Sequence, residues 1–201
     1  MHNFMANVKL SDAELALAVN SGILLTKNIV IEKVYQLFGE LAETYKMVVP
    51  DFHLPEAVLR NSPKISRGEN YNGLPWVMLD YPRYFNGNSI FSIRTMFWWG
   101  NHFSLFIILK GQPLAGKNVA AIINGLSDDW FICHAADPWQ HHFEADNMVP
   151  VKALSETQIV EIINAAGFCK LAKKIPIERW ESVNVFMQKH VEIFLAGYVS
   201  A

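Results

Sequence analysis

Histidine and carboxylate side chains are concentrated in one short stretch of the chain. Its members are His134, Asp137, His141, His142 and Glu144. Imidazole and carboxylate groups are the usual ligands of zinc and non-haem iron, and two histidines with one carboxylate leave positions open for a substrate. The spacing matches no established metal signature, and the sequence Asp-Pro-Trp at 137–139 is typical of a turn. A polar surface loop is therefore our first interpretation, and a zinc or iron site is the alternative.

Arg94 is a second group that could do chemistry, because it lies in the middle of an apolar stretch. A buried guanidinium cannot give up its proton, so it must find an anion. One interpretation is a structural ion pair with a helix carboxylate, for which Glu32, Glu40 and Glu43 are candidates. The other is an anchor for the carboxylate or phosphate of an apolar ligand. The candidate ligand-binding residues are Arg94, Arg83, Tyr81, Trp98 and Phe103.

The run from Gly111 to Lys117 fits the GxxxxGK pattern of a phosphate-binding loop. The next residue is Asn118, where that motif needs serine or threonine to hold magnesium. No apolar strand ending in a magnesium-binding aspartate follows. A turn that leaves a strand, with Asn118 capping the next helix, explains the same residues. We therefore expect no nucleotide here.

Two turn signals organise the stretch that must position these groups. Asn86-Gly87 and Gly100-Asn101 both suit two-residue hairpin turns. They predict a three-stranded antiparallel meander over residues 76–110, with strands at 76–85, 88–99 and 102–110. Both faces of this sheet are apolar, so we expect helices of the same chain or a second subunit to cover both sides.

Counting from these turns assigns the side chains to faces. Arg94 and Arg83 fall on one face with Tyr81, Trp98 and Phe103, whereas Asp80 falls on the other. A slip of one residue in either turn would exchange the faces of a strand.

The remaining segments read as helices, loops and one more strand. The predicted organisation is a single α+β domain over 1–201: helical 1–50, a long loop 51–75, a sheet core 76–135, a loop 136–154 and helical 155–199. The long loop is either a crossover or a lid over a pocket. A fourth strand near 130–134 is expected to lie parallel to a neighbour. We interpret the lysines at 170, 173 and 174 as a solvated helix end. The fold class is thus α+β, with a mixed, mostly antiparallel sheet of about four strands covered by N- and C-terminal helices.

The composition limits the function classes. Of 201 residues, 51% are hydrophobic and only 18% charged, against a typical charged fraction of ~25%. This surplus favours a homo-oligomer, most simply a homodimer, or an apolar pocket. The net charge of −2 argues against a nucleic-acid partner. Two isolated cysteines, no leader pattern and no run of ~18 apolar residues predict free thiols, no membrane span and a cytoplasmic protein.

These observations predict a non-catalytic domain that binds a small molecule or another protein, with an apolar pocket and a buried arginine. The expected ligand is an apolar small-molecule anion, and no cofactor is needed. The alternative is a metal-dependent hydrolase, or another metalloenzyme, that uses zinc or iron bound by the stretch from His134 to Glu144.

Overall fold

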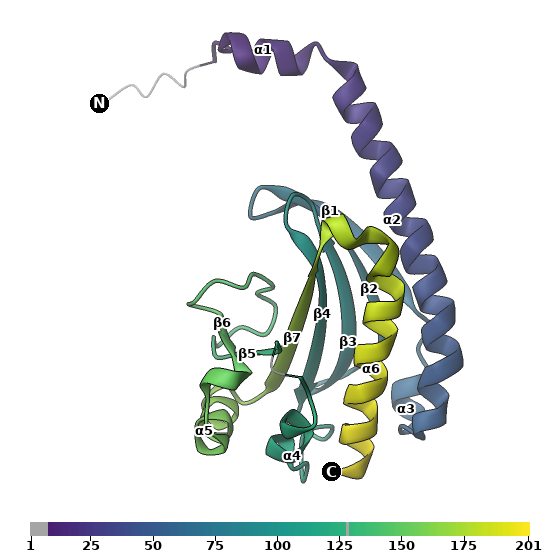
Figure 1. The fold of residues 1–201 in the computed structure, drawn as a ribbon, viewed down its shortest axis with the longest axis vertical. Helices are drawn as coiled ribbons and strands as arrows, with labels where there is room; N and C mark the ends of the chain where they lie inside the picture. The colour runs from purple at the N-terminus through teal and green to yellow at the C-terminus, as the bar shows by residue number, and fades with distance from the viewer. Residues whose placement is uncertain (1–7, 128) are drawn as a thin grey trace.

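A computed structural model describes residues 8–127 and 129–201 (Figure 1). The described residues form a seven-stranded sheet in the order β1-β2-β3-β4-β7-β5-β6, and every pair of neighbouring strands is antiparallel. The strands are β1 (Lys64–Tyr71), β2 (Leu74–Asn86), β3 (Ser89–Trp98), β4 (His102–Lys110), β5 (Phe131–Cys133), β6 (Met148–Pro150) and β7 (Cys169–Pro176). The predicted α+β class is confirmed, but the estimate of about four strands was too low.

Helices cover one face of this sheet. The described helices are α1 (Asp12–Ala18), which lies beyond the sheet, α2 (Ser21–Val48), α3 (Glu56–Leu59), α4 (Val119–Asn124), α5 (Glu156–Ala166) and α6 (Val183–Ser200), with 3-10 turns η1 (Val49–Phe52), η2 (Val151–Ala153) and η3 (Ile177–Ser182). In Figure 1, α2 and α6 lie side by side against the sheet, and the loop between β5 and β6 lies on its other side. The apolar stripe of α2 is buried there, at Ile31, Val34, Phe38, Leu41, Ala42 and Tyr45.

Several segments differ from the sequence prediction. The predicted long loop 51–75 contains the edge strand β1, which the polar sequence KISRGENY did not reveal. The predicted helical segment 155–199 contains β7 between α5 and α6, so the lysines at 170, 173 and 174 belong to a strand and not to a helix end. The predicted strand near 130–134 is β5, but it is antiparallel to both of its neighbours.

The meander is present, but neither of its turns lies where two-residue counting places it. Asn86 pairs with Ser89, and three residues instead of two separate Trp98 from His102. A bulge between Asp80 and Arg83 shifts the first register again. The bulge exchanges the side chains of β3 between the two faces relative to β2 before Pro82, and the three-residue turn exchanges them relative to β4.

This exchange changes which residues are neighbours. Asp80 lies directly opposite Arg94, on the face away from the helices. The predicted grouping of Arg94 with Tyr81 and Phe103 was wrong, because both of these aromatic side chains belong to the core cluster beneath the helices. The residues that can act with Arg94 are those of the opposite face.

Candidate functional site

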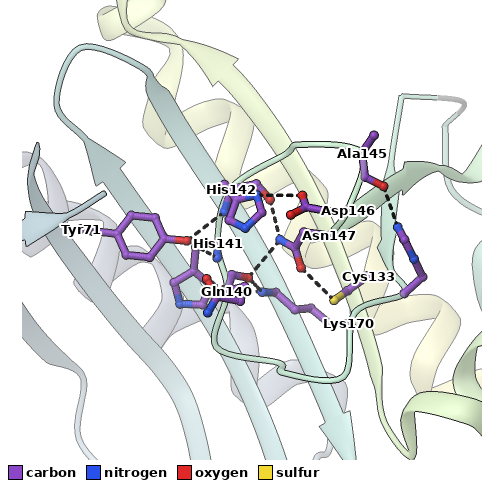
Figure 2. A network of polar contacts seen from close by, with 10 residues as sticks. Tyr71, Cys133, Gln140, His141, His142, Ala145, Asp146, Asn147 and Lys170 are labelled. Atoms are coloured by element: carbon purple, nitrogen blue, oxygen red, sulfur yellow. Dashed lines mark hydrogen bonds and ion pairs between the residues drawn. The ribbon is translucent and has the colours of Figure 1, made fainter. Parts of the chain in front are cut away.

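A loop of fourteen residues crosses the sheet face that the helices leave uncovered. We call residues 134–147, which connect β5 to β6, the cover loop. The hydroxyl oxygen of Tyr71, in the edge strand β1, accepts hydrogen bonds from the backbone N–H groups of His141 (2.6 Å) and His142 (3.1 Å). Figure 2 shows the Tyr71 ring pointing at this part of the loop. The cover loop therefore reaches from β5, near one edge of the sheet, to the strand at the other edge.

Asn147 fixes the shape of the cover loop from within. Its side-chain amide donates to the backbone oxygens of Gln140 (3.3 Å) and His142 (2.5 Å), and its carbonyl oxygen accepts from the thiol of Cys133 (3.3 Å). Asn147 is only 1% exposed, so these bonds satisfy polar groups that water does not reach. They draw the middle of the loop towards its base.

Arg94 forms a bidentate ion pair with Asp80 under the cover loop. The guanidinium Nε lies 2.6 Å from Oδ1 and Nη2 lies 3.1 Å from Oδ2, which is the fork geometry that suits a carboxylate. Both side chains are largely buried. The partner of Arg94 is thus a carboxylate of the neighbouring strand. One interpretation of the sequence, an ion pair with a helix glutamate, was wrong. The ring of Trp139 covers the guanidinium at 5.2 Å from its Cζ.

His141 lies between two cationic side chains. Its Nε2 is 3.0 Å from Arg94 Nη1, and its Nδ1 is 3.1 Å from Lys170 Nζ. The imidazole also stacks on Phe106, with ring centroids 4.7 Å apart. Burial, followed by the charges of Lys170 and Arg94, lowers the pKa of His141 well below its usual value. His141 is therefore a neutral imidazole with one N–H and one acceptor nitrogen.

Lys170 is fully buried beneath the cover loop. Its Nζ donates to the backbone oxygens of Pro138 (2.9 Å) and Gln140, and Figure 2 shows it reaching towards the loop from β7. Burial lowers the pKa of Lys170 to about 7. A large fraction of its side chain is therefore the neutral amine near neutral pH.

The neutral amine is also the form that completes the hydrogen bonds. It has two N–H donors, which match the two carbonyl oxygens, and one lone pair, which accepts the Nδ1–H of His141. Arg94 then donates to the free Nε2 of His141. A charged Lys170 has no lone pair, so it would donate a hydrogen bond to Nδ1 of His141. The imidazole proton would then lie on Nε2, where it faces an N–H donor of Arg94. One buried donor would then be unsatisfied.

A cleft of about 400 Å³ opens beside the Asp80–Arg94 pair, between the cover loop and strands β1 to β3. The rings of Tyr71, Trp76 and Trp139 line it, together with two methionine side chains. The ring of Trp76 lies across Gly68, where an added Cβ would come within 2.7 Å of it. Glycine at this position therefore allows the aromatic wall to lie close to the backbone of β1.

Two other hollows are slightly larger but lack comparable chemistry. One, of about 510 Å³, lies between α2 and the start of α6. The other, of about 520 Å³, lies near η1 and the loop from Gly111 to Lys117. In that loop the Nζ of Lys117 donates to the backbone oxygen of Tyr198 (2.8 Å), and Asn118 caps α4 as predicted. The cleft beside Arg94 differs because buried charged groups form its floor.

The structure separates the predicted ligand-binding residues. Trp98 shares the face of Arg94 and donates to the backbone oxygen of Tyr71 (3.2 Å). Arg83 instead donates to the backbone oxygen of Ser62 (3.1 Å). Tyr81 and Phe103 lie on the helix side, as described above. Sequence reasoning did not identify Tyr71, Trp139 or Lys170 as members of the site.

The predicted metal-binding residues all lie in the cover loop but do not converge. His134 contacts the backbone oxygen of Ala145, the carboxylate of Asp137 accepts from the backbone N–H of Trp139, and His142 lies 3.7 Å from Asp146. Within residues 8–127 and 129–201, no three histidine, cysteine or carboxylate side chains form a group that could hold a metal ion. The preceding residue, Cys133, is a buried thiol whose pKa is raised by burial.

Comparison with known proteins gives no relative for this chain. No protein-family model matches it, and neither a curated protein nor a solved structure does.

Proposed function

We propose that this protein binds a small anion with a flat apolar part in the cleft beside Arg94. The proposal rests on one observation: some N–H donors of the Arg94 guanidinium have no acceptor among the described residues. Arg94 has five N–H donors, of which two bond to Asp80 and one to His141. One hydrogen on each Nη remains, and no protein acceptor for these two occurs in the described part of the chain. The side chain is 13% exposed, so a ligand in the cleft can reach it.

The charge of the cleft supports an anionic ligand. Lys64 and Arg94 contribute two positive charges to its lining, and Asp80 contributes one negative charge. His141 is neutral, as argued above. An incoming carboxylate or phosphate group would therefore meet a local excess of positive charge, and Arg94 would hold it with charge-assisted hydrogen bonds.

The aromatic walls support an apolar part of the same ligand. Tyr71, Trp76 and Trp139 present three rings to a space of about 400 Å³, a volume typical of small-molecule sites. Flat apolar groups stack well on such rings. The ligand class is thus an aromatic or similarly flat carboxylate.

Binding without catalysis fits the groups available in the site. Both ring nitrogens of His141 are engaged, so neither is free to act as a general base. Burial raises the pKa of Cys133, which keeps its thiol protonated and weakly nucleophilic. The metalloenzyme alternative remains a prediction that no specific observation in the site favours.

Calorimetry with a matched pair of probes tests the proposal. Indole-3-carboxylate carries the anion and the flat ring, and indole-3-carboxamide has the same shape without the charge. We expect the carboxylate to bind at least tenfold more tightly. The variant Asp80→Asn/Arg94→Gln removes both charges while keeping polar side chains at both positions, and it should lose this preference.

The control is Glu43→Gln/Lys46→Gln, which neutralises an exposed ion pair on α2. It changes the net charge in the same way but lies away from the cleft, so its binding should match that of the unmodified protein. Equal binding of both probes, no binding of either probe, or full retention of the preference in the Arg94 variant would each overturn the proposal.

A further inference from the structure

The N-terminal arm, defined as residues 8–29, has more exposed large apolar side chains than any other segment of comparable length in the described chain. It comprises α1 and the beginning of α2, and it projects past the sheet in Figure 1. Nine large apolar side chains between residues 8 and 29 are each 47% or more exposed. The remaining described residues contain only seven exposed large apolar side chains, and these are scattered.

The apolar residues of the arm point in all directions. Ile23, Leu24 and Leu25 are consecutive and exposed, and consecutive helical residues lie about 100° apart around the axis. No residue of α1 is buried, and the first buried residue of α2 is Ile31. A helix that is apolar on all sides is normally enclosed by other elements. Within residues 8–127 and 129–201, no element encloses the arm in this way.

A lipid bilayer is a poor match for this cover. Among the described residues, no single helix is long and apolar enough to cross a membrane, although α1 and α2 with η1 meet the length and composition test as a pair bent by 59°. The bend lies at Asn20, whose side chain caps α2, and α1 begins with Asp12 and Glu14. In lipid, the backbone groups freed by the bend and these carboxylates would be costly to bury.

We propose that the N-terminal arm is a homodimer interface, in which the arms of two copies pair and enclose each other's apolar residues. A two-fold interface uses the same patch on both subunits. The arm is the one concentrated apolar surface in residues 8–127 and 129–201. The arm of one copy therefore packs on the arm of the other copy. Two helices from each copy would form a short four-helix contact, which covers an apolar helix on more than one side.

The available area agrees with a stable dimer. A leucine or isoleucine side chain carries on the order of 100 Å² of apolar surface. The nine side chains, seven of them leucine or isoleucine and two valine, are each about half exposed or more and present several hundred Å² per chain. A specific interface buries roughly 800 Å² per partner. The backbone and polar groups of both helices would supply the remainder.

The arm's position also allows the pairing. The ion pair between Lys27 and Glu69 of β1 joins the arm to the body. Beyond that point, the arm extends away from the sheet in Figure 1. Two arms can therefore approach each other without bringing the cover loops or the clefts into the interface. The dimer proposal is thus independent of the proposed ligand.

Light scattering of the full chain, coupled to gel filtration, tests the proposal. The unmodified protein should elute with twice the chain mass of 22.8 kDa at 50 µM. The variant Leu24→Glu/Leu25→Glu places four charges in the proposed interface and should elute with the mass of one chain. Its circular dichroism and its urea unfolding should match those of the unmodified protein, which shows that the body stays folded.

The matched control is Val160→Glu/Val185→Glu, which adds the same charge at exposed valines of α5 and α6. It should remain a dimer. A monomeric unmodified protein would overturn the proposal, whether or not that monomer binds phosphatidylcholine–phosphatidylglycerol vesicles. So would an arm variant that stays dimeric, or a body variant that dissociates.

Discussion

Replacing Lys170 by methionine should change how the stability of the protein depends on pH. The substitution keeps a long apolar stem and removes the amine that bonds to Pro138, Gln140 and His141. Three buried polar groups then lose their partner, so the variant is destabilised at every pH by an amount that does not titrate. The informative quantity is the difference in the free energy of unfolding between the two proteins, and how this difference changes with pH.

The direction of this change follows from the lowered pKa of Lys170. Burial moves the pKa from 10.5 to about 7 in the folded state. Between these values the unfolded chain carries a proton on this amine that the folded chain lacks. A fall in pH across this window therefore favours unfolding, and the stability contributed by Lys170 rises as pH rises. Below about pH 7 both states are protonated and the dependence levels off.

The magnitude follows from the same two pKa values. Each pH unit in the window corresponds to ~1.4 kcal/mol, so the full shift corresponds to a penalty on the order of 5 kcal/mol at low pH. From pH 7 to pH 9, the free energy of unfolding of the unmodified protein should rise by about 2 kcal/mol relative to Lys170→Met. Other titrating groups are common to both proteins and largely cancel in this difference.

Urea unfolding followed by tryptophan fluorescence, at pH 7, 8 and 9, measures the difference directly. Lys173→Met is the matched control, because Lys173 lies on the same strand but forms an ion pair with Asp129. We expect no comparable rise for this control. The difference in the free energy of unfolding between the unmodified protein and Lys170→Met could instead stay constant or fall with pH. The assignment of Lys170 as a neutral amine, and the hydrogen-bond arrangement that follows from it, would then be wrong.

Three further outcomes test the site. Asp80→Ala should destabilise the fold by about 3–5 kcal/mol, because it leaves Arg94 buried without its carboxylate, whereas Asp80→Leu/Arg94→Met should cost clearly less in the same urea titration. Tyr71→Phe removes the acceptor of two loop N–H groups. It should cost ~1–3 kcal/mol and speed hydrogen exchange at His141 and His142 more than elsewhere. Elemental analysis of untagged protein should find zinc and iron well below one atom per chain; a full equivalent would restore the metalloenzyme alternative.

The sequence predicted the central hairpins but not the edge strand. Glycines at 87 and 100 do lie in the turns, with positive φ, so the sequence located both turns, although it placed the first one residue too early and made the second one residue too short. Asn72-Gly73 is a third signal of the same kind, and it closes the hairpin between β1 and β2. It was missed because β1 is polar and half-exposed, so its residues lack the apolar alternation that indicates a strand.

The strand β7 did carry a usable pattern. Cys169, Leu171 and Ile175 alternate along it and are buried on the helix side. Lys173 interrupts the alternation, which made the segment resemble a basic helix end. A lysine at a buried strand position is rare unless it is paired, and here both buried lysines of β7 have polar partners. Sequence alone gives no sign of those partners, since they come from loops distant in the chain.

Identifying the partner of Arg94 required the register between β2 and β3. Turn signals in a sequence define such a register only to within a residue. Asp80 was assigned to the wrong face because a bulge between Asp80 and Arg83 shifts the pairing of β2 with β3 by one residue. Once the register is known, the pair follows from the alternation of the strands alone. Counting could not have found it, because a bulge leaves no distinct mark in the sequence beyond Pro82.

The second face of the sheet was expected to need cover, and a loop instead of a helix or a subunit provides it. A loop laid on an apolar face has backbone groups that must find partners there. Lys170, Asn147 and Tyr71 supply them, and their hydrogen bonds hold the cover loop. These polar residues therefore have a structural explanation. Arg94 differs, because it keeps N–H donors after its hydrogen bonds to Asp80 and His141 are made. These remaining donors make Arg94 the residue on which binding of the proposed ligand should depend.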